Sequence, residues 1–260
     1  MVDDERLVGA DRVLALLVEL AQHPDGATLE DLVAAMGGSK STIHRALGSL
    51  VRSGLADQSG RGRYVLGDEF VRLAFRHHAA RPETGRIEPV LRALAERFGE
   101  TAHYGVLDGH DIVYRAKVDP SVGAVRLTSM VGGRNPAATT AVGKVLLAGL
   151  LTTPADVVAW LDGATIDART PHTITTPEGL AAELARTRER GYGVDDQENE
   201  LGVNCLAVAI HLDGSATPTG AISVSGLEFR CPLPRLEAAY GEITGILESS
   251  LGAGTVRRPR

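Results

Sequence analysis

Aromatic residues and cysteines are scarce in this chain. Aromatic side chains make up 4% of its 260 residues, and the only cysteines are Cys205 and Cys231. Two cysteines cannot form a disulfide framework, and their spacing is not that of a zinc site. We therefore expect no metal and a reducing compartment, the cytoplasm. Because hydrophobic residues still reach 43%, the core must be built from alanine, valine, leucine and isoleucine.

Long hydrophobic runs are also missing. The one candidate segment, 13–21, is interrupted by Glu19 and follows an acidic leader. It is too short to span a bilayer and does not resemble a signal peptide, so we expect no membrane contact. The length exceeds that of one small domain, which predicts a second domain of about 170 residues.

Apolar residues at helical spacing predict two helices near the N-terminus. The first helix carries Val13, Leu16, Leu17 and Leu20, and the second carries Leu29, Leu32, Val33 and Met36. A turn signal at 23–26 separates them, and Thr28 with Asp31 matches a capping box. Gly37 and Gly38 close the second helix, so a third helix can begin a few residues later. This spacing is typical of a helix-turn-helix.

The third helix, from a cap at Ser39 onward, is apolar on one side and polar on the other. Its apolar face consists of Ile43, Ala46, Leu47 and Leu50. The opposite face carries hydroxyl, imidazole and guanidinium groups, which can contact phosphates and base edges in a major groove. Downstream, two short strand patterns flank Gly60 and Gly62 and predict a hairpin wing. The expected DNA contacts are Lys40, Ser41, Thr42, His44, Arg45, Arg52, Arg61 and Arg63.

Charge is distributed unevenly along the chain. The net charge of −6 by itself gives no indication of a nucleic-acid partner. Residues 39–63, however, contain five basic residues and one acidic residue. An ordinary solvated helix is the alternative interpretation, but the basic cluster coincides with the two elements that a winged helix presents to DNA. We therefore expect double-stranded DNA as a partner.

The remaining chain is predicted to contain a linker helix, a second domain and a tail. The linker helix, 68–82, has an apolar stripe at Phe70, Leu73, Ala74 and His77, and we expect it to form a dimer contact. Residues 83–252 alternate irregularly between helix and strand patterns, which is typical of an α+β fold. The expected strands are 102–106, 112–118, 125–129, 203–212 as a central strand, and 219–227; the expected helices are 87–98, 140–150, 154 onward, 177–190 and 234–251. The basic tail, 253–260, is expected to be disordered.

Four segments resemble the IclR family of bacterial transcriptional regulators. They are 40–45, 142–148, 191–205 and 222–226, in the family's order and spacing, and the resemblance covers nearly the whole chain. It implies a winged helix-turn-helix DNA-binding domain over 1–67, the linker helix, and a GAF-like effector-binding domain over 83–252. It also implies a homodimer or a dimer of dimers on operator DNA, acting as repressor or activator.

Polar groups in the second domain are suited to a small anionic ligand. Ser223 and Ser225 alternate on one strand, so both hydroxyls face the same side, about 7 Å apart. Thr139 and Thr140 can cap the helix that follows, which leaves N–H groups for a carboxylate. Serines on strands also bond neighbouring backbone, and a buried cysteine is often inert. By resemblance, the effector pocket contains Leu127, Asn135, Ala141, Val142, Asp195, Val203, Cys205, Ser223 and Ser225.

The chain departs from the family pattern at two positions. Ala138 stands where members commonly have a histidine, and Asn135 stands where the pocket wall is usually apolar. A polar wall favours a hydrophilic effector, and we expect a small organic acid. The acidic segment 195–200 could hold a divalent metal, but a solvated lid or a subunit contact is the favoured interpretation.

The sequence fits two other classes of protein, an enzyme and a ligand-binding protein, less well than a regulator. No phosphate-binding loop leads into Lys144, and no nucleophile elbow surrounds Ser223 or Ser225, so we expect no catalytic residue and no cofactor. A ligand-binding protein without a DNA role would leave the basic helix and the wing without a use.

Overall fold

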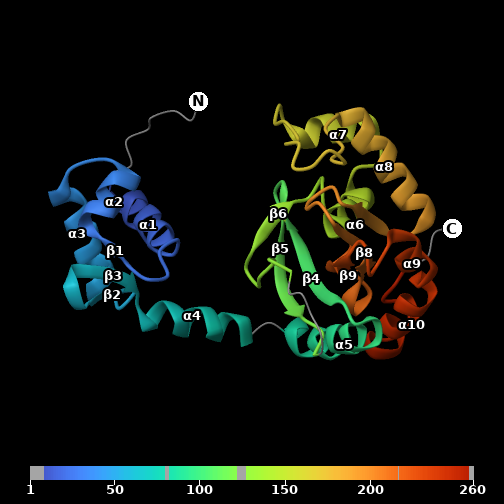
Figure 1. Cartoon of the computed structure of the whole chain (residues 1–260), viewed down its shortest axis with the longest axis horizontal. Coiled ribbons are helices and arrows are strands. Elements are labelled where there is room, and N and C mark those ends of the chain that lie inside the picture. The colour runs from blue at the N-terminus through green and yellow to red at the C-terminus, as the bar shows by residue number, and fades with distance from the viewer. Residues whose placement is uncertain (1–8, 80–81, 122–126, 216, 258–260) are drawn as a thin grey trace. The chain divides into compact units, whose positions relative to one another are not determined.

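The chain folds as two compact units divided between residues 81 and 82, and each is described by itself (Figure 1). The computed structural model describes residues 9–79, 82–121, 127–215 and 217–257. Val125, expected in a strand, and Arg258 and Arg260, expected in the basic tail, lie outside the described residues.

The first unit is a winged helix. Its helices are α1 (Gly9–Leu20), α2 (Leu29–Met36) and α3 (Lys40–Arg52), and its strands are β1 (Ala27–Thr28), β2 (Ala56–Ser59) and β3 (Arg63–Leu66). The strands pair antiparallel in the order β1-β3-β2, and the β2–β3 hairpin is the wing. The expected helices and hairpin are confirmed. Of the two glycines in the hairpin turn, Gly62 needs a positive φ, which is 71°, and Gly60 does not.

Local signals in the sequence explain where these helices begin. The Thr28 hydroxyl accepts from Asp31 N and the Asp31 carboxylate accepts from Thr28 N, so α2 starts with the expected capping box. The Ser39 hydroxyl caps α3 by accepting from Thr42 N at 3.2 Å. The inward faces of the three helices form one core that includes Leu16, Leu20, Leu32, Ile43 and Leu47. The polar face of α3 is therefore left on the surface.

Helix α4 (Asp68–Ala79) follows the wing and has exposed apolar side chains. Phe70 is 36% exposed, Leu73 46% and Phe75 68%. Such a patch on a helix is favourable to bury against another surface. The helix ends at Ala79, and α5 (Pro82–Phe98) begins where the linker helix was expected to end.

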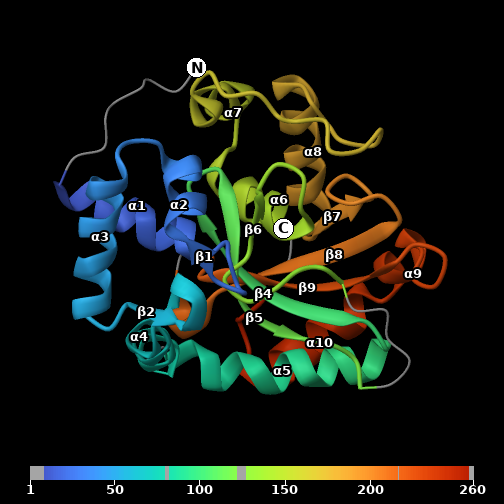
Figure 2. The ribbon, with the colours of Figure 1, turned by 60° about the vertical axis from the view of Figure 1, so that its left-hand side comes forward.

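The second unit is an antiparallel sheet with helices on both faces (Figure 2). The strand order is β6-β5-β4-β9-β8-β7. The strands are β4 (Thr101–Asp108), β5 (Asp111–Val118), β6 (Arg134–Pro136), β7 (Gly193–Asp196), β8 (Val203–Ile210) and β9 (Gly220–Leu227). Besides α5, the helices are α6 (Ala141–Leu150), α7 (Pro154–Leu161), α8 (Pro177–Arg190), α9 (Leu233–Ala238) and α10 (Tyr240–Leu251).

Alternate residues of the central strands enter two different cores. On one face, Tyr104, Ile222 and Val224 pack with α5 and α10. On the other face, Ala207 and Ala221 pack with α6 and α8. The α+β fold with an N-terminal winged helix is thus confirmed, and the face toward α6 carries the smaller side chains.

Several expected elements differ from those in the structure. Leu127 and Ser129 are not in a strand, because their carbonyls instead accept from Lys117 Nζ at 3.0 and 2.7 Å. The expected central strand ends at Ile210 and lies second from the edge, because β7, too short to show an alternating pattern, pairs outside it. The expected C-terminal helix is two helices, α9 and α10, which meet at Ala239.

Residues 253–257, expected to belong to a disordered tail, are ordered. Thr255 and Val256 are buried, and the Thr255 carbonyl accepts from His211 N at 2.9 Å. Val256 joins the core beneath α5 and α10. Burial of this apolar side chain fixes residues 253–257 despite the basic composition of the tail.

Taken one at a time, no helix in the described ranges is both long and apolar enough to cross a membrane. The pair α6 and α7 reaches that length only together, with a bend of 116° between them. Residues 141–148 of α6 are all buried within the second unit.

Candidate functional site

A cavity of about 220 Å³ opens in the second unit beside the N-terminus of α6. It brings together every residue that the family resemblance assigned to an effector pocket: Leu127, Asn135, Ala141, Val142, Asp195, Val203, Cys205, Ser223 and Ser225. It also has lining residues that were not expected, which include His103, Tyr114, Arg134, Arg169, Asn199 and Glu200. His103 could have been suspected, because a polar residue interrupts the apolar start of an otherwise buried strand.

The N-terminus of α6 presents free backbone donors to the cavity. The Thr140 hydroxyl caps the helix by accepting from Gly143 N at 3.1 Å. No described residue accepts from the N–H groups of Ala141 and Val142, and both residues line the cavity. A Cβ atom at Gly143 would lie 2.1 Å from the Ala137 carbonyl oxygen, so only glycine permits this approach. The helix end is therefore suited to an anion.

Strands β4 and β9 supply hydroxyl and imidazole groups. The Oγ atoms of Ser223 and Ser225 each lie 3.4 Å from His103 Nδ1, and His103 Nε2 lies 2.8 Å from Ser129 Oγ. Burial lowers the pKa of His103 to about 3, so the imidazole is neutral. Burial likewise raises the pKa of Tyr114, whose ring centroid is 4.7 Å from that of His103. This wall is polar but uncharged.

Asp195 on β7 is the acidic group of the cavity wall. Its side chain is buried, and its Oδ1 accepts from Glu198 N at 2.8 Å and from Asn199 N at 3.2 Å. Burial, against the attraction of Lys144, raises the pKa of Asp195 to about 7. Cys205 is its register partner on β8, and burial raises the pKa of that thiol well above its ordinary value.

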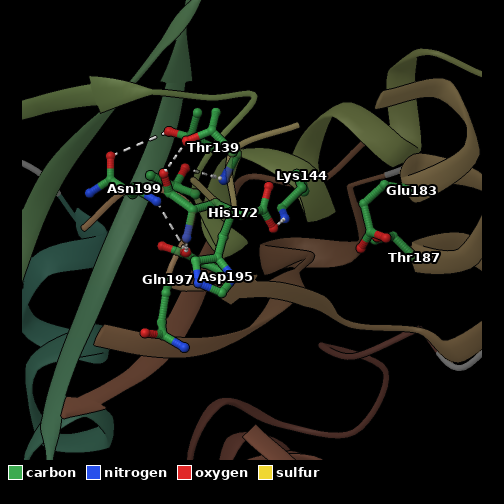
Figure 3. Close-up of polar contacts among 12 residues, drawn as sticks. Thr139, Lys144, His172, Glu183, Thr187, Asp195, Gln197 and Asn199 are labelled. Carbon is green, nitrogen blue, oxygen red and sulfur yellow. Dashed lines mark hydrogen bonds and ion pairs between the residues drawn. The ribbon is translucent and has the colours of Figure 1, made fainter. Parts of the chain in front are cut away.

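A buried ion-pair cluster lies behind the cavity (Figure 3). Lys144 is fully buried on α6, and its ammonium contacts the carboxylate of Glu198. Within the described ranges, Glu198 Oε2 has no hydrogen-bond partner, and burial raises the pKa of this group. Glu183 on α8 is also near Lys144, and two arginines of α8 pair with it. Figure 3 shows Lys144 between the side of the cavity, with Asp195, and α8, with Glu183.

The segment between β7 and β8 forms part of the rim of the cavity, and hydrogen bonds fix its position. The Thr139 hydroxyl donates to Asn199 Oδ1 at 3.3 Å, and Arg169 Nε donates to the Asn199 carbonyl at 2.9 Å. The Thr170 hydroxyl donates to the Gln197 carbonyl at 2.6 Å. Internal contacts thus fix the segment, and no group of three or more histidine, cysteine, aspartate or glutamate side chains placed to hold a metal ion occurs in the ranges that the structure describes.

The expected DNA-contacting residues of the first unit differ in how free they are. Lys40, Ser41, His44, Arg45 and Arg52 are exposed on α3. Two of these cations have protein partners: Lys40 Nζ is 2.7 Å from Glu30 Oε1, and Arg52 Nη2 donates to Ser49 Oγ at 3.1 Å. The side chains of His44 and Arg45 have no such partner among the described residues.

The three remaining expected DNA contacts are Thr42, Arg61 and Arg63. Arg63 is the first residue of β3 and not part of the turn at the wing tip, and its Nη1 donates to the Gly26 carbonyl at 2.6 Å. The Thr42 hydroxyl is half-buried and lies 2.9 Å from Ser39 Oγ. Arg61 is in the hairpin turn, and its side chain lies outside the described part of the chain.

A winged helix, followed by an α+β unit with an internal polar cavity, defines a DNA-binding transcriptional regulator. The sequence matches the model "Bacterial transcriptional regulator IclR C-terminal" over residues 84–244 and the IclR helix-turn-helix domain over residues 9–60. The chain belongs to the IclR family, as its sequence motifs indicated.

Individual relatives agree with this assignment. The HTH-type transcriptional regulator XynR of Escherichia coli K12 is 35% identical over 221 residues, which cover 85% of this chain and 86% of that protein. The crystal structure of Thermotoga maritima IclR, 25% identical, has a TM-score of 0.70 and covers 92% and 94% of the two chains. An IclR homolog from Microbacterium hydrocarbonoxydans, complexed with 4-hydroxybenzoate, shares the fold at 23% identity, a TM-score of 0.75 and coverage of 92% and 98%.

Proposed function

We propose that this regulator binds a small organic acid in the cavity of its second unit and that the bound acid changes its affinity for operator DNA. The observation that carries this proposal is the convergence of uncharged donors on one cavity at the α6 N-terminus. The complex of the Microbacterium homolog with 4-hydroxybenzoate supports an organic acid as the ligand class.

The expected pocket residues have distinct roles in this proposal. The ligand carboxylate accepts from the N–H groups of Ala141 and Val142 and from the hydroxyls of Ser223 and Ser225. Asp195 contacts a second polar group of the ligand. The wall consists of Leu127, Asn135, Val203 and Cys205. Ser223 Oγ and Ser225 Oγ lie 3.4 Å from His103 Nδ1, but burial lowers the pKa of His103 to about 3 and makes it a weak base, so we propose binding without turnover.

A double variant, Ser225→Ala with Asp195→Ala, tests the cavity. Thermal-shift screening of small organic acids, with 4-hydroxybenzoate among them, first identifies a ligand; at about 100 times its Kd it adds about 2.7 kcal/mol to stability. We expect the double variant to weaken that ligand at least about tenfold in calorimetry, because each lost contact contributes about 1 kcal/mol. Operator binding without ligand should stay unchanged.

Ser249→Ala, which removes an exposed hydroxyl from α10, is the control and should bind the ligand as the wild type does. Unchanged ligand affinity in the double variant would show that the ligand binds elsewhere. Consumption of the ligand at a catalytic rate would show that the protein is an enzyme and would contradict the proposed function.

We further propose that the protein acts in the cytoplasm as a homodimer or a dimer of dimers. The exposed stripe of α4 is the suggested dimer contact, because it offers apolar area that nothing within its unit covers. A symmetric dimer on DNA requires an inverted repeat whose half-sites are about one helical turn apart, or multiples of that spacing.

A charge introduced into this stripe tests the assembly. We expect Leu73→Glu to shift the dimer toward monomer at micromolar concentration, because the carboxylate would have to be buried without a partner. Light scattering at several concentrations measures the shift. Arg76→Gln, on the same helix but polar, should leave the mass unchanged. A wild-type monomer that protects a single half-site would contradict the proposed contact.

A further inference from the structure

The buried carboxyl groups beside the cavity are not all paired with a cation. Among the residues described there, Lys144 supplies one buried ammonium, whereas Asp195 and Glu198 supply two buried carboxyl groups. The third nearby carboxylate, Glu183, is paired with two arginines of α8. Glu198 pairs with Lys144, and Glu183 pairs with the two arginines, so Asp195 is the buried carboxyl group of this set that has no paired cation among the described residues. A buried site removes such a charge most readily by binding a proton.

The geometry distinguishes the two carboxyl groups. Glu198 contacts the ammonium of Lys144, whereas no ion pair of Asp195 occurs among the described residues. Asp195 Oδ1 accepts hydrogen bonds from two backbone N–H groups. Asp195 Oδ2 accepts no hydrogen bond from any of the residues described. Because Asp195 also lines the cavity, its free oxygen is the one that an incoming ligand can meet.

None of the other titratable groups described around this aspartate forms an ion pair with it. Cys205 from β8 and Tyr114 from β5 are uncharged, because burial raises the pKa of each. His103 from β4 is neutral, since burial lowers its pKa to about 3. At the rim, the carboxylate of Glu200 accepts from Thr128 Oγ1, and the positively charged Arg169 donates from Nε to a backbone carbonyl. Arg134, which also lines the cavity, pairs with Asp108 and Asp111.

We propose that Asp195 is a proton-carrying group of the cavity, so that an anionic effector binds together with one proton. This inference rests on the proposed effector site. A carboxylate bound at the α6 N-terminus adds a second negative charge to the cavity, and repulsion between the two charges favours the protonated form of Asp195. The solvent supplies the proton. The neutral carboxyl can then donate its O–H to a hydroxyl or carbonyl oxygen of the ligand.

This coupling makes effector binding depend on pH. Burial, against the attraction of Lys144, raises the pKa of Asp195 to about 7, so the free group loses its proton as the pH rises through that value. The ligand must then restore the proton. Affinity should fall as the pH rises above 7 and approach a loss of about tenfold per pH unit near pH 9.

The first experiment requires no ligand. Carboxyl-carbon NMR of the full chain labelled with ¹³C-aspartate should show one resonance that titrates near pH 7 and is missing in Asp195→Asn. Asp196→Asn, the exposed neighbour on β7, should keep it. If every aspartate titrates below pH 5, Asp195 carries no proton at neutral pH and the proposal is wrong.

The second experiment uses 4-hydroxybenzoate, or the acid that the thermal-shift screen identifies, as the probe. Calorimetry at pH 8 in buffers of different ionisation enthalpy should show uptake approaching one proton in the wild type and in Asp196→Asn, and uptake near zero in Asp195→Asn. The Asp195→Asn variant, whose amide is neutral, should bind the acid with a Kd that hardly changes between pH 6 and pH 9.

The outcomes separate this proposal from the function on which it rests. Acid binding without proton uptake overturns the proton coupling and leaves the effector site intact. If no acid binds although Asp195 titrates near pH 7, the proposed ligand class is wrong, and the proton-linked binding of an acid falls with it.

Discussion

Replacing Lys144 by methionine should lower the free energy of unfolding of the second unit by about 3–5 kcal/mol, since the carboxylate of Glu198 would lose the one cation with which it pairs among the described residues. Methionine has a similar length and fills the same space, so packing is largely kept. The loss should be measured by urea unfolding at pH 8. A loss below about 1 kcal/mol would mean that water reaches Glu198.

The pH dependence of the Lys144→Met variant gives an independent check. Without the ammonium, the pKa of Glu198 should rise further above its already raised value in the folded state. A group whose pKa is raised on folding favours the folded state below that pKa, and the advantage is lost as the pH rises through it. The variant should therefore be closer to the wild type at pH 5 than at pH 8.

Two further variants serve as controls. Lys144→Met combined with Glu198→Gln should recover much of the lost stability, because the side chain at position 198 then carries no charge that needs a partner. Lys40→Met makes the same substitution at an exposed ion pair, with Glu30, and should leave the unfolding midpoint nearly unchanged. A double variant no more stable than Lys144→Met alone would show that packing, and not charge, causes the loss.

Replacing Arg45 by alanine should weaken binding to the cognate operator by about 1–3 kcal/mol and reduce the preference for it over other DNA. Arg45 is exposed on α3 and has no partner within the described ranges, so its guanidinium is available for a base edge. Fluorescence anisotropy at fixed salt measures both effects.

The wing should behave differently. Arg61→Ala is expected to weaken binding to all sequences alike and to lower the slope of log affinity against log salt by about 1, as the loss of a phosphate contact does. Arg63→Gln should have the smaller effect, because that guanidinium is bound to the Gly26 carbonyl. Wild-type affinity in both Arg45→Ala and Arg61→Ala would contradict the winged-helix interface.

The sequence predicted elements well where a local signal was strong. The stripe of α3, the cap at Thr28 and the Pro177–Arg190 helix closed by Gly191 depend on nearby residues alone. Strand β7 is too short to show a period, and the segment at Leu127 is held by a lysine from β5. Such features depend on contacts distant in sequence, which a pattern cannot express.

The residues of the cavity also divide into those that the sequence predicted and those whose role depends on contacts distant in sequence. The family motifs identified nine of its lining residues, and Ser223 with Ser225 could be inferred from strand alternation. The partner of Lys144 could not, because Glu198 lies 54 positions along the chain and approaches only when the β7–β8 segment folds back. The raised pKa of Asp195 likewise results from burial, which no spacing reveals.

The alternation along β4 and β9 has a consequence for how such proteins can diverge. His103, Ser223 and Ser225 line the cavity, whereas Tyr104, Ile222 and Val224, their immediate neighbours, pack with α5 and α10. In the proposed function, a substitution on the cavity side changes the contacts with the ligand, while the side chains of the opposite core stay in place. The two strands thus let ligand preference evolve without putting the stability of the scaffold at risk.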